Sequence, residues 1–213
     1  MDEKIKKLKD IIAAIPSSSD HDLEHTIRVY NLCLHLAKGE KDVNGNVLEA
    51  AAMLHDIARE EENNNPELDH ALLGAEMAGL ILKDFDFTAE EVENIKHCIS
   101  AHRYRNSVKP ETIEAKILFD ADKLDSTGAI GISRAMAWVG RNNTQIYTTP
   151  EQTKIAIEKK SKTTDSPQTE FEVKIKTIEA KMFTVSGKKI AKERIEFYKN
   201  FLDRLEKEIN GCL

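Results

Sequence analysis

Apolar residues recur every three or four positions along nearly the whole chain, and no segment sustains an alternation of apolar and polar positions. Because an α-helix turns once in about 3.6 residues, this spacing collects apolar side chains on one face of each helix. Polar stretches such as "VNGN" and "EENNNPE" separate the helical segments. The pattern predicts an all-α protein, a single-domain helical bundle over residues 1–213.

A longer polar stretch covers residues 141–169 and contains Pro150 and the run "SKTTDSP". It predicts a long loop with at most one weak helix. Long loops within compact domains are often functional, so this segment is expected to form either a lid over a site or a disordered excursion.

One long helix is predicted from about residue 20 to residue 38. Its apolar stripe consists of Leu23, Ile27, Tyr30, Leu34 and Ala37. His25 and Arg28 fall on the opposite side, where further apolar residues also lie, so the helix should be buried around most of its circumference. A buried histidine needs a polar partner. Taken alone, His25 fits a hydrogen-bonded core residue as well as a metal ligand, and Arg28 could simply pair with Glu24.

Two further places combine acids or histidines with apolar helices. The doublet His55-Asp56 follows the packed run "AAML", which puts both side chains at the edge of the core. In "LFDADKLD", Asp120 falls on the apolar stripe whereas Asp122 points away from it. Asp122 is therefore the better ligand candidate, and Asp120 is expected to be a buried, hydrogen-bonded structural acid.

Composition narrows the function further. The chain has 31 basic and 37 acidic residues, a net charge of −6, which argues against nucleic-acid binding by bulk charge. No apolar run approaches the roughly 18 residues of a membrane span. The first residues lack the apolar core of a signal peptide, and the three cysteines lack CxxC spacing, so a reducing, cytoplasmic location is expected.

Two histidines and two aspartates on three helices suit one divalent cation. Neutral imidazole nitrogens and carboxylate oxygens bind Mn, Fe, Zn or Mg-like ions, and four protein ligands leave room for water or substrate oxygens. His25, His55, Asp56 and Asp122 are thus candidate metal ligands.

The order and rough separation of these residues resemble the HD superfamily of metal-dependent phosphohydrolases. The flanking stretches "EHTIRVYNLCLHLA", "LEAAAMLHDIARE" and "FDADKLDSTGAIGISRA" also look like that superfamily, in a compact stand-alone bacterial and archaeal branch. The resemblance implies an HD-type helical fold and a divalent metal (Mn, Mg, Fe, Co, Ni or Zn) held by His25, His55, Asp56 and Asp122. It also implies hydrolysis of phosphoester or phosphoanhydride bonds, commonly in nucleotides.

Further roles follow from that chemistry. Asp56 could also orient the attacking water, and Glu60 could act as a base, although a polar helix end explains Glu60 equally well. Arg28 and Lys123 are candidates for phosphate oxygens. For Lys123, the alternative is a solvated side chain.

In binuclear members of the superfamily, extra ligands come from a histidine four residues before a glycine and from a histidine that ends the next helix. His70 and His102 match these positions, and they are predicted either as ligands of a second metal or as substrate contacts; a surface or core position is the alternative. His97 lies about 140° around the helix from His102, so His102 is favoured. Arg103, beside His102, is a candidate phosphate contact. At residues 102–106 this chain has "HRYRN", where the cyclic-dinucleotide branch of the superfamily has a His-His-Glu run. Specificity for cyclic dinucleotides is therefore not expected.

The sequence thus predicts a phosphohydrolase of phosphorylated small molecules, with nucleotides as the leading class. A catalytically inactive module that binds metal and nucleotide as a sensor is the alternative. A purely structural helical protein would leave the polar residues on buried helices unexplained. No membrane or nucleic-acid partner is expected, and the amphipathic terminal helix could serve a homodimer as readily as its own core.

Overall fold

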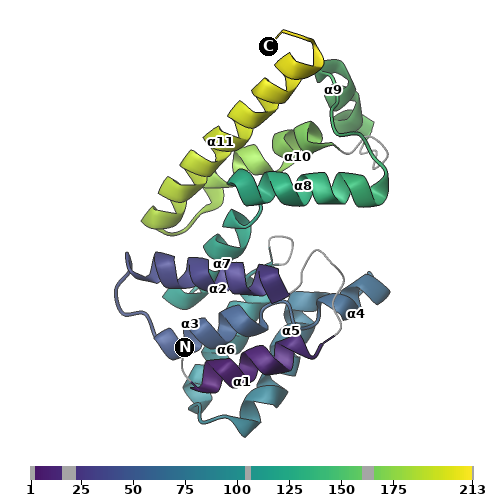
Figure 1. Ribbon diagram of the computed structural model, residues 1–213. Coiled ribbons are helices and arrows are strands. Elements are labelled where there is room, and N and C mark those ends of the chain that lie inside the picture. Colours follow the sequence, from purple (N-terminus) through teal and green to yellow (C-terminus); the bar gives the residue numbers. More distant parts are fainter. Residues whose placement is uncertain (1–2, 16–22, 104–106, 160–165, 213) are drawn as a thin grey trace. The chain divides into compact units, whose positions relative to one another are not determined.

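The computed structural model describes residues 3–15, 23–103, 107–159 and 166–212 (Figure 1). Within these ranges the regular elements are helices and no strand forms, so the predicted all-α class is confirmed. The chain forms two compact units. The first contains Met1–Asp122 and Phe183–Ser186, and the second contains Lys123–Met182 and Gly187–Leu213. The predicted single domain over the whole chain stays a prediction.

The first unit is built around α3, which packs against three other helices of the unit. Its helices are α1 (Glu3–Ala13), α2 (Leu23–Ala37), α3 (Gly45–Leu54), α4 (Arg59–Asn64), α5 (His70–Ile81), α6 (Ala89–Ala101) and α7 (Ile113–Leu124), the last up to Asp122. Almost every α3 residue from Val47 onward is buried, which suits a stretch rich in alanine and leucine. α1, α2 and α6 contact α3, and α5 packs against α6 and α4 (Figure 1).

Side-chain caps fix where the helices of this unit begin. Asn44 caps α3 by accepting a hydrogen bond from the Val47 backbone N–H, and Asp69 caps α5. Thr88 and Glu91 form the reciprocal capping box that opens α6. Each cap satisfies backbone N–H groups that have no partner inside the helix. The start of α5 at His70 therefore follows directly from the aspartate that precedes it.

The buried face of α2 differs from the predicted apolar stripe. Its buried residues are His25, Thr26, Val29, Tyr30, Cys33 and Leu36. Of the predicted stripe only Tyr30 is among them, while Leu23, Ile27, Leu34 and Ala37 are half-buried. The sequence offers apolar residues on both sides of this helix, and packing in the folded chain selects the side that carries His25. His25 is therefore buried, as a metal site inside the protein would require.

The second unit carries the remaining helices. They are α8 (Gly128–Asn142), α9 (Pro150–Lys159), α10 (Pro167–Val173), the 3-10 turns η3 (Ile175–Thr177) and η4 (Glu179–Lys181), and α11 (Val185–Ile209) from Gly187 on. α10 packs against α8, α9 and η3. Buried apolar residues such as Val139, Ile175 and Tyr198 form its core. Within the described ranges, no helix of either unit is both long and apolar enough to cross a membrane.

Residues 141–169 are not one continuous loop. α9 occupies Pro150–Lys159 and α10 begins at Pro167, while residues 160–165 lie outside the described ranges. The Thr149 hydroxyl accepts from the Gln152 N–H, and the Gln152 side chain accepts from the Thr149 N–H. This reciprocal cap, followed by proline in the first turn, is a strong helix start that the polar composition concealed. The role of the segment as a lid stays a prediction.

Candidate metal centre

Six predicted ligand residues, all in the first unit, converge from five places in the chain. They are His25 on α2, His55 and Asp56 in the turn after α3, His70 at the start of α5, His102 just after α6, and Asp122 in the last turn of α7. The doublet follows Leu54, the last residue of α3, and the Ile57 N–H bonds back to the Leu54 carbonyl. The structure places the doublet in a turn that links α3 to α4.

His25, His55 and Asp122 form a first cluster. The Nε2 atoms of His25 and His55 lie 3.2 Å apart, and His25 Nε2 lies 3.5 Å from Asp122 Oδ1. One ligand atom from each of the three residues falls within 4.8 Å of the others. His25 and His55 are buried, whereas the Asp122 side chain keeps 14% exposure, so the cluster is open mainly at Asp122.

Asp56, His70 and His102 form a second cluster of the same kind. His70 Nε2 lies 3.3 Å from His102 Nε2, and Asp56 Oδ1 lies 3.4 Å from the first and 3.5 Å from the second. His102, favoured from helix geometry, lies in this cluster, whereas the His97 Nε2 atom accepts a hydrogen bond from the Glu111 N–H.

Asp56 connects the two clusters. Its Oδ2 atom lies 3.6 Å from His25 Nε2 and 3.7 Å from His55 Nε2, while Oδ1 faces His70 and His102. The carboxylate is only 4% exposed. One carboxylate thus presents a different oxygen to each pair of imidazoles.

Hydrogen bonds at the outer nitrogen fix the tautomers of three imidazoles. His55 Nδ1 lies 2.8 Å from the Ala52 carbonyl oxygen, and His102 Nδ1 lies 2.6 Å from that of Ile99. His70 Nδ1 contacts the Glu62 carboxylate. Carbonyl and carboxylate oxygens only accept, so each Nδ1 carries the proton and each Nε2 presents a lone pair to the centre.

These lone pairs are the observation that tests whether a metal fits. Two imidazole lone pairs at 3.3 Å beside a carboxylate oxygen repel one another unless a cation lies between them. Protonation of the rings would remove this repulsion, but it is unfavourable near neutral pH because burial lowers the pKa of His55 to about 4 and also lowers the pKa of His70. Neutral imidazoles and carboxylates, with their outer atoms already bonded, suit a divalent cation in each cluster.

Asp120 has the structural role expected from its position on the apolar stripe. Its side chain is fully buried and accepts hydrogen bonds from the backbone N–H groups of Phe183 and Thr184, at 2.9 and 2.8 Å. The Thr184 hydroxyl adds a third at 2.7 Å. Asp120 and Asp122, two residues apart on α7, therefore divide into a structural acid and a member of the first cluster.

Three of the predicted substrate-contact and base residues have partners within the protein. Arg28 lies 3.9 Å from Glu24, the pairing that the sequence offered as an alternative, and Asn63 donates to Glu60 at 3.4 Å. Arg103 forms ion pairs with Glu62 at 2.6 Å and with Asp69 at 2.9 Å. Lys123 follows Asp122 on α7 and belongs to the second unit. The roles of Arg28, Glu60, Arg103 and Lys123 stay predictions.

Two residues of the site were missed from the sequence, Arg59 and Glu62. Arg59 Nη2 donates to Asp56 Oδ1 at 3.1 Å, and Nη1 donates to Glu62 Oε2 at 3.2 Å. Glu62 also contacts His70 and Arg103. Asp56, Arg59 and Glu62 are charged residues three positions apart, and on a helical turn this spacing brings side chains together. The spacing could have indicated from the sequence that Arg59 and Glu62 lie near Asp56.

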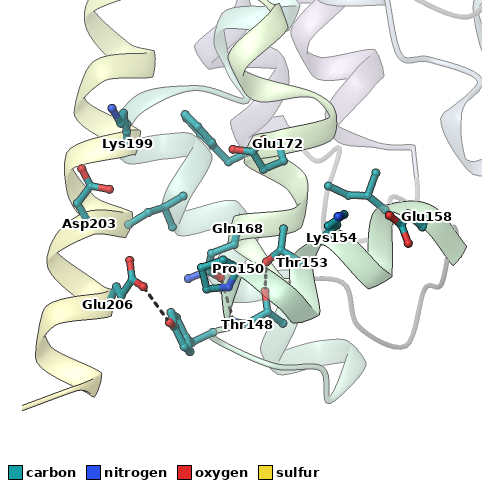
Figure 2. A pocket seen from close by; sticks show the side chains of 14 residues that line it. Thr148, Pro150, Thr153, Lys154, Glu158, Gln168, Glu172, Lys199, Asp203 and Glu206 are labelled. Atoms are coloured by element: carbon teal, nitrogen blue, oxygen red, sulfur yellow. Dashed lines mark hydrogen bonds between the residues drawn. The ribbon is translucent and has the colours of Figure 1, made fainter.

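The second unit contains a cavity of about 510 Å³ between α9, α10 and α11 (Figure 2). Its wall combines apolar side chains such as Phe171 and Leu202 with charged residues, among them Lys154, Glu172 and Asp203. It contains no histidine or cysteine, and no cluster of metal-binding type forms there within the described ranges. The chemistry of a metal centre therefore belongs to the first unit.

The chain is similar to known proteins over most of its length. The chain is 28% identical to the Bacillus subtilis protein YpgQ over 198 residues, which cover 91% of this chain and 87% of YpgQ. A crystal structure of an HD-superfamily hydrolase from Bacillus thuringiensis, 27% identical, superposes with a TM-score of 0.74 over 98% of this chain and 97% of that one. The structure of YpgQ in complex with ADP has the same fold, with a TM-score of 0.74 at 24% identity and coverage of 98% and 100%.

The HD domain family model matches residues 22–127, the segment that contains the six clustered candidate ligand residues. The chain therefore belongs to the HD domain superfamily, and its relatives of known structure include HD-superfamily hydrolases.

Proposed function

We propose that this protein is a metal-dependent phosphohydrolase acting on a phosphorylated small molecule, with nucleotides as the leading substrate class. The position of Asp56 is the observation that carries the proposal, because its two oxygens face two separate pairs of imidazole nitrogens. His25, His55, Asp56 and Asp122 would hold one divalent ion, and Asp56, His70 and His102 would hold a second. Bound divalent ions supply Lewis acidity toward a phosphoryl oxygen and toward the attacking water.

Groups of the protein itself orient these rings. The backbone carbonyl oxygens of Ala52 and Ile99 bind the Nδ1 atoms of His55 and His102, which aims each Nε2 at the centre. Glu62 does the same for His70. Arg28 lies one turn after His25 on α2 and is half-buried, which makes it the candidate for a phosphate oxygen once Glu24 is displaced.

Nucleotides are the first substrates to test for two reasons. Phosphoanhydrides and phosphomonoesters concentrate negative charge at one end, as a site for divalent cations requires. YpgQ, the relative that is 28% identical, was also solved in complex with ADP, although that structure does not identify a reaction.

The test is a metal analysis of the purified full-length protein followed by a hydrolysis screen. Nucleoside mono-, di- and triphosphates are incubated with Mn, Mg, Co or Ni, and released phosphate or pyrophosphate is measured. We expect release that disappears in His55→Ala and in Asp56→Ala. His35→Ala is the matched control, because His35 is exposed on α2 and lies outside both clusters. Tight nucleotide binding without release under every metal would refute the hydrolase and favour a sensor.

A further inference from the structure

The Arg59 guanidinium contacts the Asp56 oxygen that a second metal ion would also bind. Its Nη2 atom donates to Asp56 Oδ1 at 3.1 Å, and the same oxygen faces His70 Nε2 at 3.4 Å and His102 Nε2 at 3.5 Å. Its other terminal nitrogen, Nη1, donates to Glu62, which contacts the outer nitrogen of His70. Both acceptors of the guanidinium are therefore parts of the second cluster, one a ligand candidate and the other a residue that orients a ligand.

The first cluster faces the other oxygen of Asp56. Arg59 approaches Asp56 through Oδ1 and not through Oδ2, the oxygen that faces His25 and His55. Asp122 adds a second negative charge to the first cluster. The two clusters thus differ in their candidate carboxylate ligands. The first has the carboxylates of Asp56 and Asp122, whereas the second has that of Asp56, whose Oδ1 atom also accepts from Arg59.

A cation at the second cluster would lie close to that guanidinium. Metal-to-oxygen distances of about 2.0–2.2 Å would put the ion against Asp56 Oδ1, which already accepts from Arg59. Like charges at this separation in a buried site repel strongly. Arg59 is only partly held in this position, because its Nε atom is buried with no hydrogen-bond partner among the described residues and its side chain keeps 23% exposure.

We propose that the Arg59 guanidinium competes with a second divalent ion for Asp56 Oδ1. The His25–His55–Asp122 cluster then loads first, and the second ion binds weakly until Arg59 moves off the aspartate. The inference rests on the proposed metal dependence, and it assigns Arg59 a regulatory role in that same site. The alternative role predicts the opposite change in metal affinity. If Arg59 merely oriented Asp56, it would favour metal binding, and replacing Arg59 would weaken the binding of the second ion.

The experiment is a titration of metal-free, full-length protein with Mn²⁺, in which electron paramagnetic resonance of unbound Mn²⁺ counts the ions bound. In the unmodified protein we expect one tight and one weaker ion. In Arg59→Met we expect the dissociation constant of the second ion to fall by about 5- to 150-fold, the usual range of coupling between two sites. The first ion should change much less.

Arg103→Met is the matched control. Arg103 also pairs with Glu62, but its second ion pair is with Asp69, whereas that of Arg59 is with Asp56. Arg59→Lys keeps the charge and should stay near the unmodified protein. Equal tightening in Arg59→Met and Arg103→Met would mean that general charge governs affinity, which overturns the competition. Weaker binding of the second ion in Arg59→Met overturns it as well.

A measurement on the unmodified protein covers the case in which Arg59→Met does not fold. Nuclear magnetic resonance of the arginine side chains is followed during titration with diamagnetic Mg²⁺ or Zn²⁺. The Arg59 guanidinium signals should change with the second equivalent of metal and not with the first. Signals that change with the first equivalent, or never change while two ions bind, refute the inference alone. If no ion binds to any form of the protein, the proposed function fails together with it.

Discussion

The Nε2 atoms of His70 and His102 face each other at 3.3 Å, while the Nδ1 atom of each ring is tied to an oxygen acceptor. The rings cannot turn to relieve this contact without giving up the bonds to Glu62 and to the Ile99 carbonyl. Their orientation is therefore set before any ligand arrives, as expected of a preorganised site. Several measurable consequences follow from this geometry and from that of Asp56.

Replacing Asp56 by asparagine should remove both proposed ions. Asparagine has the same shape but one fewer anionic oxygen, so neither cluster keeps its shared charged ligand. Loss of an outer hydrogen-bond partner already costs about 10- to 100-fold in metal affinity, and loss of a shared ligand should exceed that. Metal content measured by mass spectrometry after dialysis, together with hydrolysis rates, tests this. Two retained ions at unchanged affinity would contradict the proposed bridging position.

Glu62→Gln should weaken metal binding at the second cluster more than at the first. Glutamine can still contact His70 Nδ1, but a neutral amide holds the imidazole proton less strongly than a carboxylate. We expect about a 10- to 100-fold loss of affinity for the second ion. Calorimetric titration with Mn²⁺ gives the two affinities separately. Glu67→Gln, an exposed acid in the following turn, is the control and should match the unmodified protein.

Asp120→Asn and Asp122→Asn should affect different properties, stability and metal affinity respectively, although the two residues share one helix. Asp120 accepts three hydrogen bonds in a buried site, so its change should lower the free energy of unfolding by about 1–3 kcal/mol. Asp122→Asn should leave the metal-free stability nearly unchanged and reduce the affinity of the first ion. Thermal melts without metal and ion titrations compare the two. Equal effects on stability would refute the division of roles on α7.

The metal-free protein should lose stability in mild acid. In the unfolded chain, histidines take up protons below about pH 6.5, whereas burial lowers the folded-state pKa of His55 to about 4 and also lowers that of His70. The unfolded state therefore binds more protons as the pH falls from about 6.5 toward about 4, and the free energy of unfolding falls with it. Each histidine contributes up to about 1.4 kcal/mol per pH unit in that window.

Urea unfolding in the presence of a chelator, repeated between pH 7.5 and about 4.5, measures this slope. His55→Gln removes one of the two groups and should flatten it, while glutamine can still donate to the Ala52 carbonyl that His55 Nδ1 contacts. A free energy of unfolding that stays constant as the pH falls through this window would show that neither histidine resists protonation in the folded state.

Much of the fold and of the site could be read from the sequence because the signals are local. The capping box of Thr88 and Glu91 marks the start of α6, and the helical azimuth separates Asp120 from Asp122. The choice of His102 over His97 also rested on the angle between neighbouring helical positions. Each of these properties depends on a few consecutive residues, so no knowledge of distant partners was needed.

The rest depended on contacts between distant segments. Both sides of α2 carry apolar residues, and only packing in the folded chain decides that the side with His25 is buried. The ion pairs of Arg103 with Glu62 and Asp69 also join separate segments of the chain, so no local pattern predicts them. Arg59 was overlooked because its significance lies in which oxygen of Asp56 it contacts, and no periodicity encodes that choice.

The hydrogen bonds of Asp120 can form only late in synthesis of the chain. Its donors, Phe183 and Thr184, lie 63 and 64 residues further along the chain, and they belong to the same unit as the ligands. A growing chain that has already produced His25, the doublet and Asp122 still leaves the Asp120 carboxylate without these partners. A nascent chain that stalls before Phe183 therefore contains all six candidate ligand residues but lacks the hydrogen bonds that join Asp120 of α7 to Phe183 and Thr184.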